Sequence, residues 1–209
     1  MKIITLFISA LWLSGCAVGV KHDYEVARVN LGFESNATVN VATLDHRPYV
    51  RSGDKSETFV GLSRGGLGNP FDINTRSGES LADDISDSIV GSLNGSGMRA
   101  KKVLLKPSQS LESAFEILPF DTAHRSLLFQ LIEWKGDSMA NIAFLYDFEV
   151  YVLNEKGETL VKKHYKAREK LGSADPFNPG GGGHIHDRFR QLISELFSNK
   201  EIKSTLVKE

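Results

Sequence analysis

The sequence predicts an α+β fold, with one mixed, largely antiparallel sheet and two main helices packed on a face. Two features of the sequence lead to this class. Helical and extended segments alternate in the first half of the chain, and extended segments follow one another in the second half. This order is typical of a sheet whose helices gather on one face. The length of 209 residues fits a single such domain with short appendages.

Residues 1–15 have the layout of an export signal. Lys2 supplies a positive charge, and residues 3–13 are almost wholly apolar. This stretch is too short to span a bilayer, which needs roughly 20 helical residues. The following Leu13-Ser14-Gly15-Cys16 closely resembles the lipobox of bacterial lipoproteins. We therefore expect residues 1–15 to be a lipoprotein signal peptide.

The resemblance to a lipobox implies that the thiol of Cys16 receives a covalent lipid. Cys16 is the single cysteine of the chain, so it has no partner for an intrachain disulfide. Several acyl chains anchor a protein far more firmly than one. Ala17 differs from the aspartate that is associated with inner-membrane retention in enteric bacteria. The expected location is thus the periplasmic side of the outer membrane, with residues 16–37 as the lipidated N-terminus and tether.

A single α+β domain is expected over residues 38–209. Residues 38–44 are rich in β-branched side chains and predict a strand that Pro48 prevents from continuing. Residues 58–62 form a second extended segment, and a glycine-rich loop is expected over residues 63–78. A helix follows, capped by Ser77 or Ser80 and terminated by glycines. Its inward face repeats every four residues, through Leu81, Ile85, Ile89 and Leu93.

The later elements complete the sheet and its helical cover. Strands are expected over residues 98–105 and 126–134, with a short helix over residues 110–118 between them. Residues 142–153 and 158–170 form the clearest hairpin, because apolar side chains alternate along the first segment and a turn sequence separates the two. A second glycine-rich loop, over residues 180–183, precedes an amphipathic helix over residues 185–197. A short terminal helix capped by Ser198 ends the chain.

The order of these features resembles one family. In the first half, the lipobox, the strand that runs into Asp45-His46-Arg47 and the helix that ends in Gly95-Ser96-Gly97 carry the resemblance. In the second half, it is carried by LLFQLIEWKGDSMANIAFLYDFEVYVLNEKGETLVKKHYKARE and NKEIKSTL. Together these look like the YajG-like bacterial lipoproteins, relatives of the auxiliary lipoprotein components of ABC-type transport systems. The resemblance covers most of residues 38–207 and implies a fold and a compartment rather than a mechanism.

The composition excludes several classes of function. The chain holds 25 basic and 26 acidic residues, for a formal net charge of −1, which gives no electrostatic footprint for nucleic acid. A single cysteine excludes a zinc ribbon or an iron–sulfur cluster from this chain alone. We therefore expect no cofactor apart from the lipid on Cys16. The expected partners are the membrane, through the acyl chains, and an envelope protein.

A metal site is conceivable at residues 184–187, but the pattern is weak. His184 and His186 lie two residues apart, and in an extended segment they would reach one metal ion. The competing interpretation is that both are polar residues of a loop and helix start. The preceding glycines would pre-organise a site poorly, and the sequence offers no third ligand.

Asp45 and Arg47 lie two residues apart at the end of a strand, so their side chains are expected on one face. One interpretation is an ion pair that fixes the loop. The other is recognition of a partner or ligand by Arg47.

The returning strand of the hairpin carries a basic stripe, in which positive side chains recur at every second residue. With the nearest registers, Asp147 and Glu149 lie opposite two of them. The stripe is either a solvated face that protects a sheet edge from stray pairing or a surface for an anionic partner. Its members are Lys162, His164, Lys166, Arg168 and Lys170.

Two classes of function follow from these residues. The first is a non-catalytic binding or accessory module in envelope assembly or transport. Its working surface would comprise the basic stripe, the Asp45/Arg47 pair and the loop over residues 64–72. Phe71 in that loop is either an aromatic anchor for a partner or a core residue. The second is an envelope hydrolase or metal-dependent enzyme that uses His184 and His186. The sequence contains no nucleophile elbow, and we expect no enzymatic activity.

Overall fold

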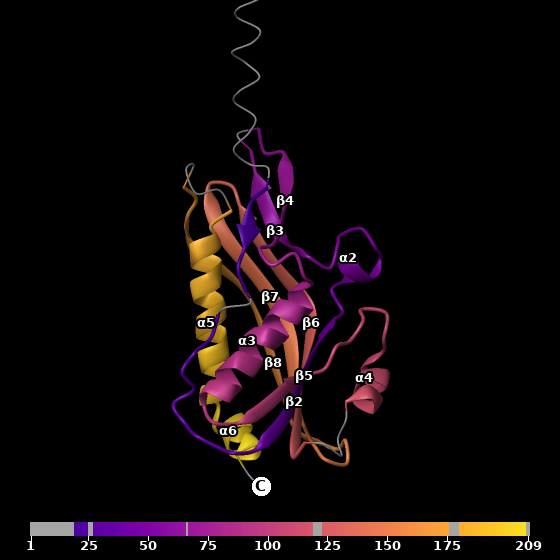
Figure 1. Ribbon diagram of the computed structural model, residues 1–209. Coiled ribbons are helices and arrows are strands. Elements are labelled where there is room, and N and C mark those ends of the chain that lie inside the picture. The colour runs from indigo at the N-terminus through magenta and orange to yellow at the C-terminus, as the bar shows by residue number, and fades with distance from the viewer. Residues whose placement is uncertain (1–18, 25–26, 66, 119–122, 176–179, 208–209) are drawn as a thin grey trace, which may run out of the picture.

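The structure is a computed structural model that describes residues 19–24, 27–65, 67–118, 123–175 and 180–207. The signal peptide and Cys16 lie outside the described residues. The chain folds into an eight-stranded mixed sheet with helices on it, as Figure 1 shows, and the predicted α+β class is confirmed. Among the described residues, no helix is long and apolar enough to cross a membrane.

The elements follow the predicted order with some shifts of boundary. The strands are β1 (Lys21–His22), β2 (Thr38–Asp45), β3 (Phe59–Arg64), β4 (Pro70–Thr75), β5 (Arg99–Lys102), β6 (Arg125–Ser138), β7 (Asn141–Asn154) and β8 (Thr159–Ser173). The helices are α2 (Pro48–Arg51), α3 (Leu81–Gly95), α4 (Leu111–Ile117), α5 (Gly182–Ser198) and α6 (Lys200–Leu206).

The long strand β6 organises the sheet. On one side it pairs antiparallel with β7, which pairs antiparallel with the edge strand β8. On the other side it has two neighbours in succession. Residues 125–131 pair parallel with β2, and residues 136–138 pair parallel with β3. The sheet therefore forks along β6, with β5 beyond β2 in one branch and β4 and β1 beyond β3 in the other.

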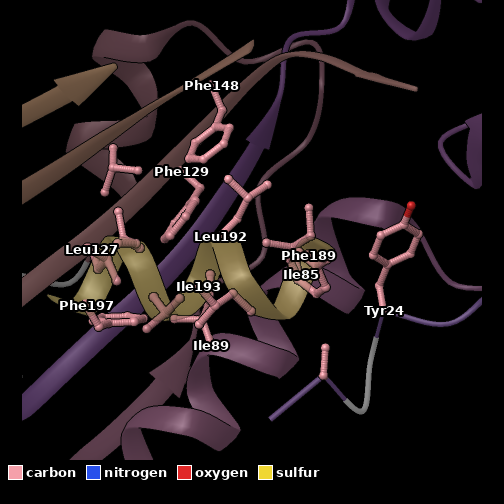
Figure 2. Close-up of a cluster of buried hydrophobic side chains, with 14 of the residues drawn as sticks. Tyr24, Ile85, Ile89, Leu127, Phe129, Phe148, Phe189, Leu192, Ile193 and Phe197 are labelled. Atoms are coloured by element: carbon pink, nitrogen blue, oxygen red, sulfur yellow. The ribbon is translucent and has the colours of Figure 1, made fainter. Parts of the chain in front are cut away.

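The core lies between one face of the sheet and the helices α3, α5 and α6. Phe148 and Val150 are buried in the same apolar cluster as Ile85 and Ile89 of α3, which confirms the predicted inward face of the hairpin. Figure 2 shows α5 side chains meeting Phe129 and Phe148 of the sheet. Burying one such side chain contributes about 1.5–3 kcal/mol relative to leaving it in water. A smaller cluster under α4 covers one end of the opposite face.

Side-chain caps set the starts of α3, α4 and α6. At α3, the hydroxyl of Ser80 accepts a hydrogen bond from the backbone N–H of Asp83 at 3.0 Å, so Ser80 and not Ser77 is the cap. At α6, Asn199 rather than the predicted Ser198 accepts the first backbone N–H groups. Pro119, expected to end the short helix, lies outside the described residues.

Two predicted boundaries are wrong. Residues 19–37 are no simple tether, because they contain β1 and bury Tyr24 and Ala27 completely. The predicted loop over residues 63–78 contains β4, which forms a hairpin with β3. Gly68, with φ of +82°, adopts the left-handed backbone in the turn of that hairpin.

Candidate functional site

Asp45 and Arg47 lie inside the molecule, at the fork of the sheet. Their side chains are 1% and 0% exposed and form a bidentate ion pair, with Arg47 Nε 2.8 Å from Asp45 Oδ1 and Nη2 2.6 Å from Oδ2. Arg47 Nη1 also donates to the carbonyl oxygens of Phe59, at 2.5 Å, and Trp134, at 3.4 Å. These carbonyls belong to β3 and β6, where β6 exchanges one neighbour for the other. The prediction that the pair contacts a partner is therefore wrong, because neither side chain reaches the surface.

His184 and His186 lie in the first turn of α5, which begins at Gly182. Residues two apart on a helix do not face each other, so the two imidazoles leave the helix in different directions. The extended backbone that a shared metal site required is absent at these positions. Among the described residues, no group of three or more potential ligands gathers around a metal site. The extended two-histidine arrangement that the metal-dependent alternative required is thus not formed at His184 and His186.

Phe71 lies in β4, opposite Ser63 of β3, and is half-buried. Its ring packs on the backbone at Gly65, where an added Cβ would lie 3.3 Å from the ring atom Cε2. Phe71 is therefore held against its own hairpin, with part of the ring exposed near the turn.

The basic stripe lies on the sheet face opposite α3 and α5. Side chains of β6, β7 and β8 line up there in rows across the strands, and we call this surface the open face. In order from the end next to α4, the rows are Leu128–Tyr151–Lys162, Gln130–Glu149–His164, Glu133–Asp147–Lys166, Lys135–Leu145–Arg168 and Asp137–Ala143–Lys170.

The stripe pairs with the carboxylates that the hairpin register predicted. Lys162 Nζ lies 2.9 Å from Glu149 Oε2, and Asp147 receives His164 Nε2 at 2.7 Å and Lys166 Nζ at 2.6 Å. Three of the five positive positions are thus engaged by two carboxylates. Asp147 is only 7% exposed, whereas the Lys166 side chain is 68% exposed. Lys166 therefore lies over the Asp147 carboxylate and is itself in contact with solvent.

The electrostatics of these acids follow from the ion pairs. Burial raises the pKa of Asp147, but hydrogen bonds from Lys166 and His164 outweigh it and hold the pKa below its usual value. Burial likewise raises the pKa of Glu149, and the hydrogen bonds from Tyr151 and Lys162 lower it further than burial raises it. Both acids therefore remain ionised near neutral pH and fix the positions of the stripe.

A polar network continues from the open face toward α4. Tyr151 donates a hydrogen bond to Glu149, and the amide of Gln130 lies 2.9 Å from Nδ1 of His46. The other ring nitrogen of His46 lies 2.8 Å from the carbonyl oxygen of Gln109. These contacts tie the open face to the loop before α4.

The far end of the stripe is electrostatically different. Among the described residues, no carboxylate lies within ion-pair distance of Arg168 or Lys170. Both side chains line a shallow groove with Met139 and the Arg64–Asp137 ion pair. The hydrogen bond from Arg64 lowers the pKa of Asp137, and the nearby charges of Lys135 and Arg168 lower it further. Asp137 therefore offsets part of the positive charge at this end, and Arg168 and Lys170 form no ion pair of their own among the described residues.

Sequence reasoning missed the contribution of β6 to the open face. Gln130, Glu133 and Lys135 sit there because the register of β6 against β7 shifts between Leu131 and Glu133. The shift moves the open-face positions from even to odd numbers, so strict alternation cannot place them. A polar pattern that changes parity within one long strand is the signal that could have found them.

Comparisons with known proteins support the fold alone. No family model and no curated protein matches the sequence. The structure is similar to that of XCC0632 from Xanthomonas campestris, a DUF330 protein, with a TM-score of 0.53, 10% identity, and coverage of 90% of this chain and 96% of that one. It is more distantly similar to a PelC dodecamer subunit from Paraburkholderia phytofirmans (TM-score 0.40, 11% identity, 87% and 94% covered). Lipoprotein GNA1162 from Neisseria meningitidis is similar at a TM-score of 0.30, with 11% identity and 76% and 96% covered.

Proposed function

We propose that this chain is a lipoprotein anchored through Cys16 on the periplasmic side of the outer membrane. In this proposal its domain acts as a non-catalytic binding module for an envelope protein in assembly or transport. The lipobox supports the anchor, and the sequence resemblance to YajG-like lipoproteins supports the compartment. The observation that carries the binding role is the open face, a hydrogen-bonded sheet surface lined with exposed cations.

The charge of the open face indicates the chemistry of the partner. Asp147 and Glu149 neutralise part of the stripe, and Arg168 adds a positive charge that has no carboxylate within ion-pair distance among the described residues. A surface of this kind favours an acidic partner, because complementary charge steers encounter and selects against basic proteins. The cations also protect the edge strand β8 from stray pairing, so specific binding through side chains is favoured over strand addition.

Site-specific photocrosslinking in living cells tests this proposal. A photoreactive amino acid placed at Lys162 or Lys166 should capture one envelope protein. The matched control is Arg190, which is also exposed but lies on α5, on the other side of the sheet. A discrete adduct from the two open-face positions and none from Arg190 is the expected result. An adduct from Arg190 alone would place the binding surface elsewhere.

A charge-reversal variant sharpens the test. Arg168→Glu should weaken capture at Lys166 several-fold and leave the melting temperature close to that of wild type, because the side chain is exposed. Undiminished capture by this variant would contradict the electrostatic role of the face.

A further inference from the structure

One end of the domain exposes apolar side chains from two neighbouring turns. Leu67, in the turn between β3 and β4, is 93% exposed, and Met139, between β6 and β7, is 58% exposed. The turns lie side by side, because Ser63 of β3 pairs with Ser138 of β6. A Cβ added at Gly68 would lie 3.9 Å from Met139 Cε. A single exposed leucine needs no explanation, whereas two such side chains in adjoining turns, with half-buried Phe71 beside them, form a patch.

The surroundings of this patch are basic on balance. Lys170 occupies the row of the open face nearest the turns, and Arg168 lies in the row behind it. Carboxylates also lie toward this end, but they are paired. Asp137 is held by Arg64 in a bidentate pair with both distances 2.8 Å, Asp72 by Lys55 at 2.6 Å and Glu169 by Arg188 at 2.7 Å. Asp175 also interacts with another group. An apolar centre with basic side chains beside it is the composition of a surface that contacts anionic lipid.

The chain enters the domain at this same end. Strand β1 runs parallel to β4, with Lys21 opposite Asn74, so residues before Lys21 lie toward the start of β4 and its turn with β3. In Figure 1 the β3–β4 turn stands at the end of the molecule remote from α6 and the C-terminus. Only three peptide units separate Cys16 from Gly19, and fully extended they span about 11 Å. A lipid on Cys16 would therefore hold this end close to the bilayer.

We propose that this end, formed by Leu67, Met139 and the adjacent Lys170, docks onto an anionic phospholipid surface. The apolar side chains enter the boundary between headgroups and acyl chains, and the ammonium group of Lys170 contacts a lipid phosphate. The proposal rests on the proposed lipid anchor at Cys16 and adds an orientation to it. With the turns on the membrane, the strands of the open face stand away from the bilayer, and Lys162 and Lys166 remain accessible to a protein partner.

A tryptophan reporter tests the docking. Residues 16–209 are joined through the single thiol, Cys16, to a maleimide-bearing phospholipid in vesicles of phosphatidylethanolamine and phosphatidylglycerol. Leu67→Trp places an exposed indole in the patch, while Trp134 is buried and gives a constant background. Lipids with bromine on their acyl chains should quench the added emission about twofold or more. The control Leu104→Trp, at a position 68% exposed beside β5, should stay unquenched.

Two further variants separate the apolar and charged contributions. Met139→Glu combined with Leu67→Trp should remove the quenching. Lys170→Glu should reduce quenching to the level found on vesicles of phosphatidylcholine alone. Quenching that is unchanged by both this substitution and the charge of the lipid would overturn the electrostatic contribution to docking.

The docking proposal would be overturned if the emission of the tethered Leu67→Trp chain were quenched no more than that of the Leu104→Trp chain. The maleimide supplies the tether in every arm, so the outcome is independent of whether Cys16 is acylated in cells. Failure of the anchor would instead appear as absence of lipid on Cys16 in the cell.

Discussion

Replacing Arg47 by methionine should destabilise the domain strongly. The change leaves Asp45, which is 1% exposed, as a buried carboxylate without its counter-charge, and removing one partner of a buried ion pair costs about 3–5 kcal/mol. The carbonyl oxygens of Phe59 and Trp134 also lose a donor at the fork. For a domain stabilised by about 5–15 kcal/mol, the melting temperature should fall by roughly 6–20 °C, since 1 kcal/mol corresponds to about 2–4 °C at this chain length.

Thermal and urea unfolding followed by circular dichroism measure this effect. The matched control is Arg64→Met, which breaks an arginine–carboxylate pair of similar geometry whose side chains are 31% and 24% exposed; its cost should be no more than about 1 kcal/mol. The double variant Asp45→Leu/Arg47→Met removes both charges and should recover part of the loss. If Arg47→Met melts within a degree or two of wild type, the claim that the buried Asp45–Arg47 pair holds the fork together is refuted.

Three further predictions concern the core, the open face and the fork. Phe148→Ala should cost about 3–5 kcal/mol in the free energy of unfolding, and a loss below about 1 kcal/mol would show that the predicted core face is loosely packed. Burial raises the pKa of Asp147, but its ion pairs outweigh burial and lower the pKa. The stability that these pairs add is therefore complete above the pKa of the unfolded chain, near 3.9, and is lost as the pH falls through the folded-state pKa. Urea titrations at a series of pH values should therefore show a steeper loss for wild type below about pH 4 than for Asp147→Asn, and parallel curves would argue against the pairs. Gly61→Ala would set a Cβ 2.6 Å from the carbonyl oxygen of Gly136, whereas the added Cβ of Gly95→Ala meets nothing within 4 Å. Calorimetry should find Gly61→Ala clearly destabilised and Gly95→Ala not. Equal melting temperatures of the two variants would contradict the close approach of β3 to β6.

The sequence was sufficient to predict the parts of the fold that depend on local periodicity. The apolar repeat of α3 and the alternation along β7 predicted their inward faces, and the buried residues of both elements confirm them. The hairpin register, deduced from the turn, correctly placed Asp147 and Glu149 opposite the basic stripe, because side-chain direction in a strand has a strict period of two.

The features that the sequence did not predict depend on contacts between distant segments. Tyr24 is buried although its neighbours show no helical or strand pattern, because it packs on Trp134 and Phe189 from otherwise separate elements. Arg47 occupies the interior because β6 changes neighbours there, and pairing between strands cannot be read from either strand alone. The spacing of Asp45 and Arg47 therefore favoured an ion pair but left a partner contact open, and the structure shows the ion pair.

Lipidation of Cys16 is the claim on which the anchored, membrane-facing account most directly depends. Cells that express the wild-type chain and the Cys16→Ser variant are labelled with radioactive palmitate, and the protein is recovered from separated membrane fractions. The account predicts label on the wild-type chain in the outer-membrane fraction, and an unlabelled Cys16→Ser precursor that retains its signal peptide. Label on the Cys16→Ser chain, or none on the wild-type chain, would contradict it.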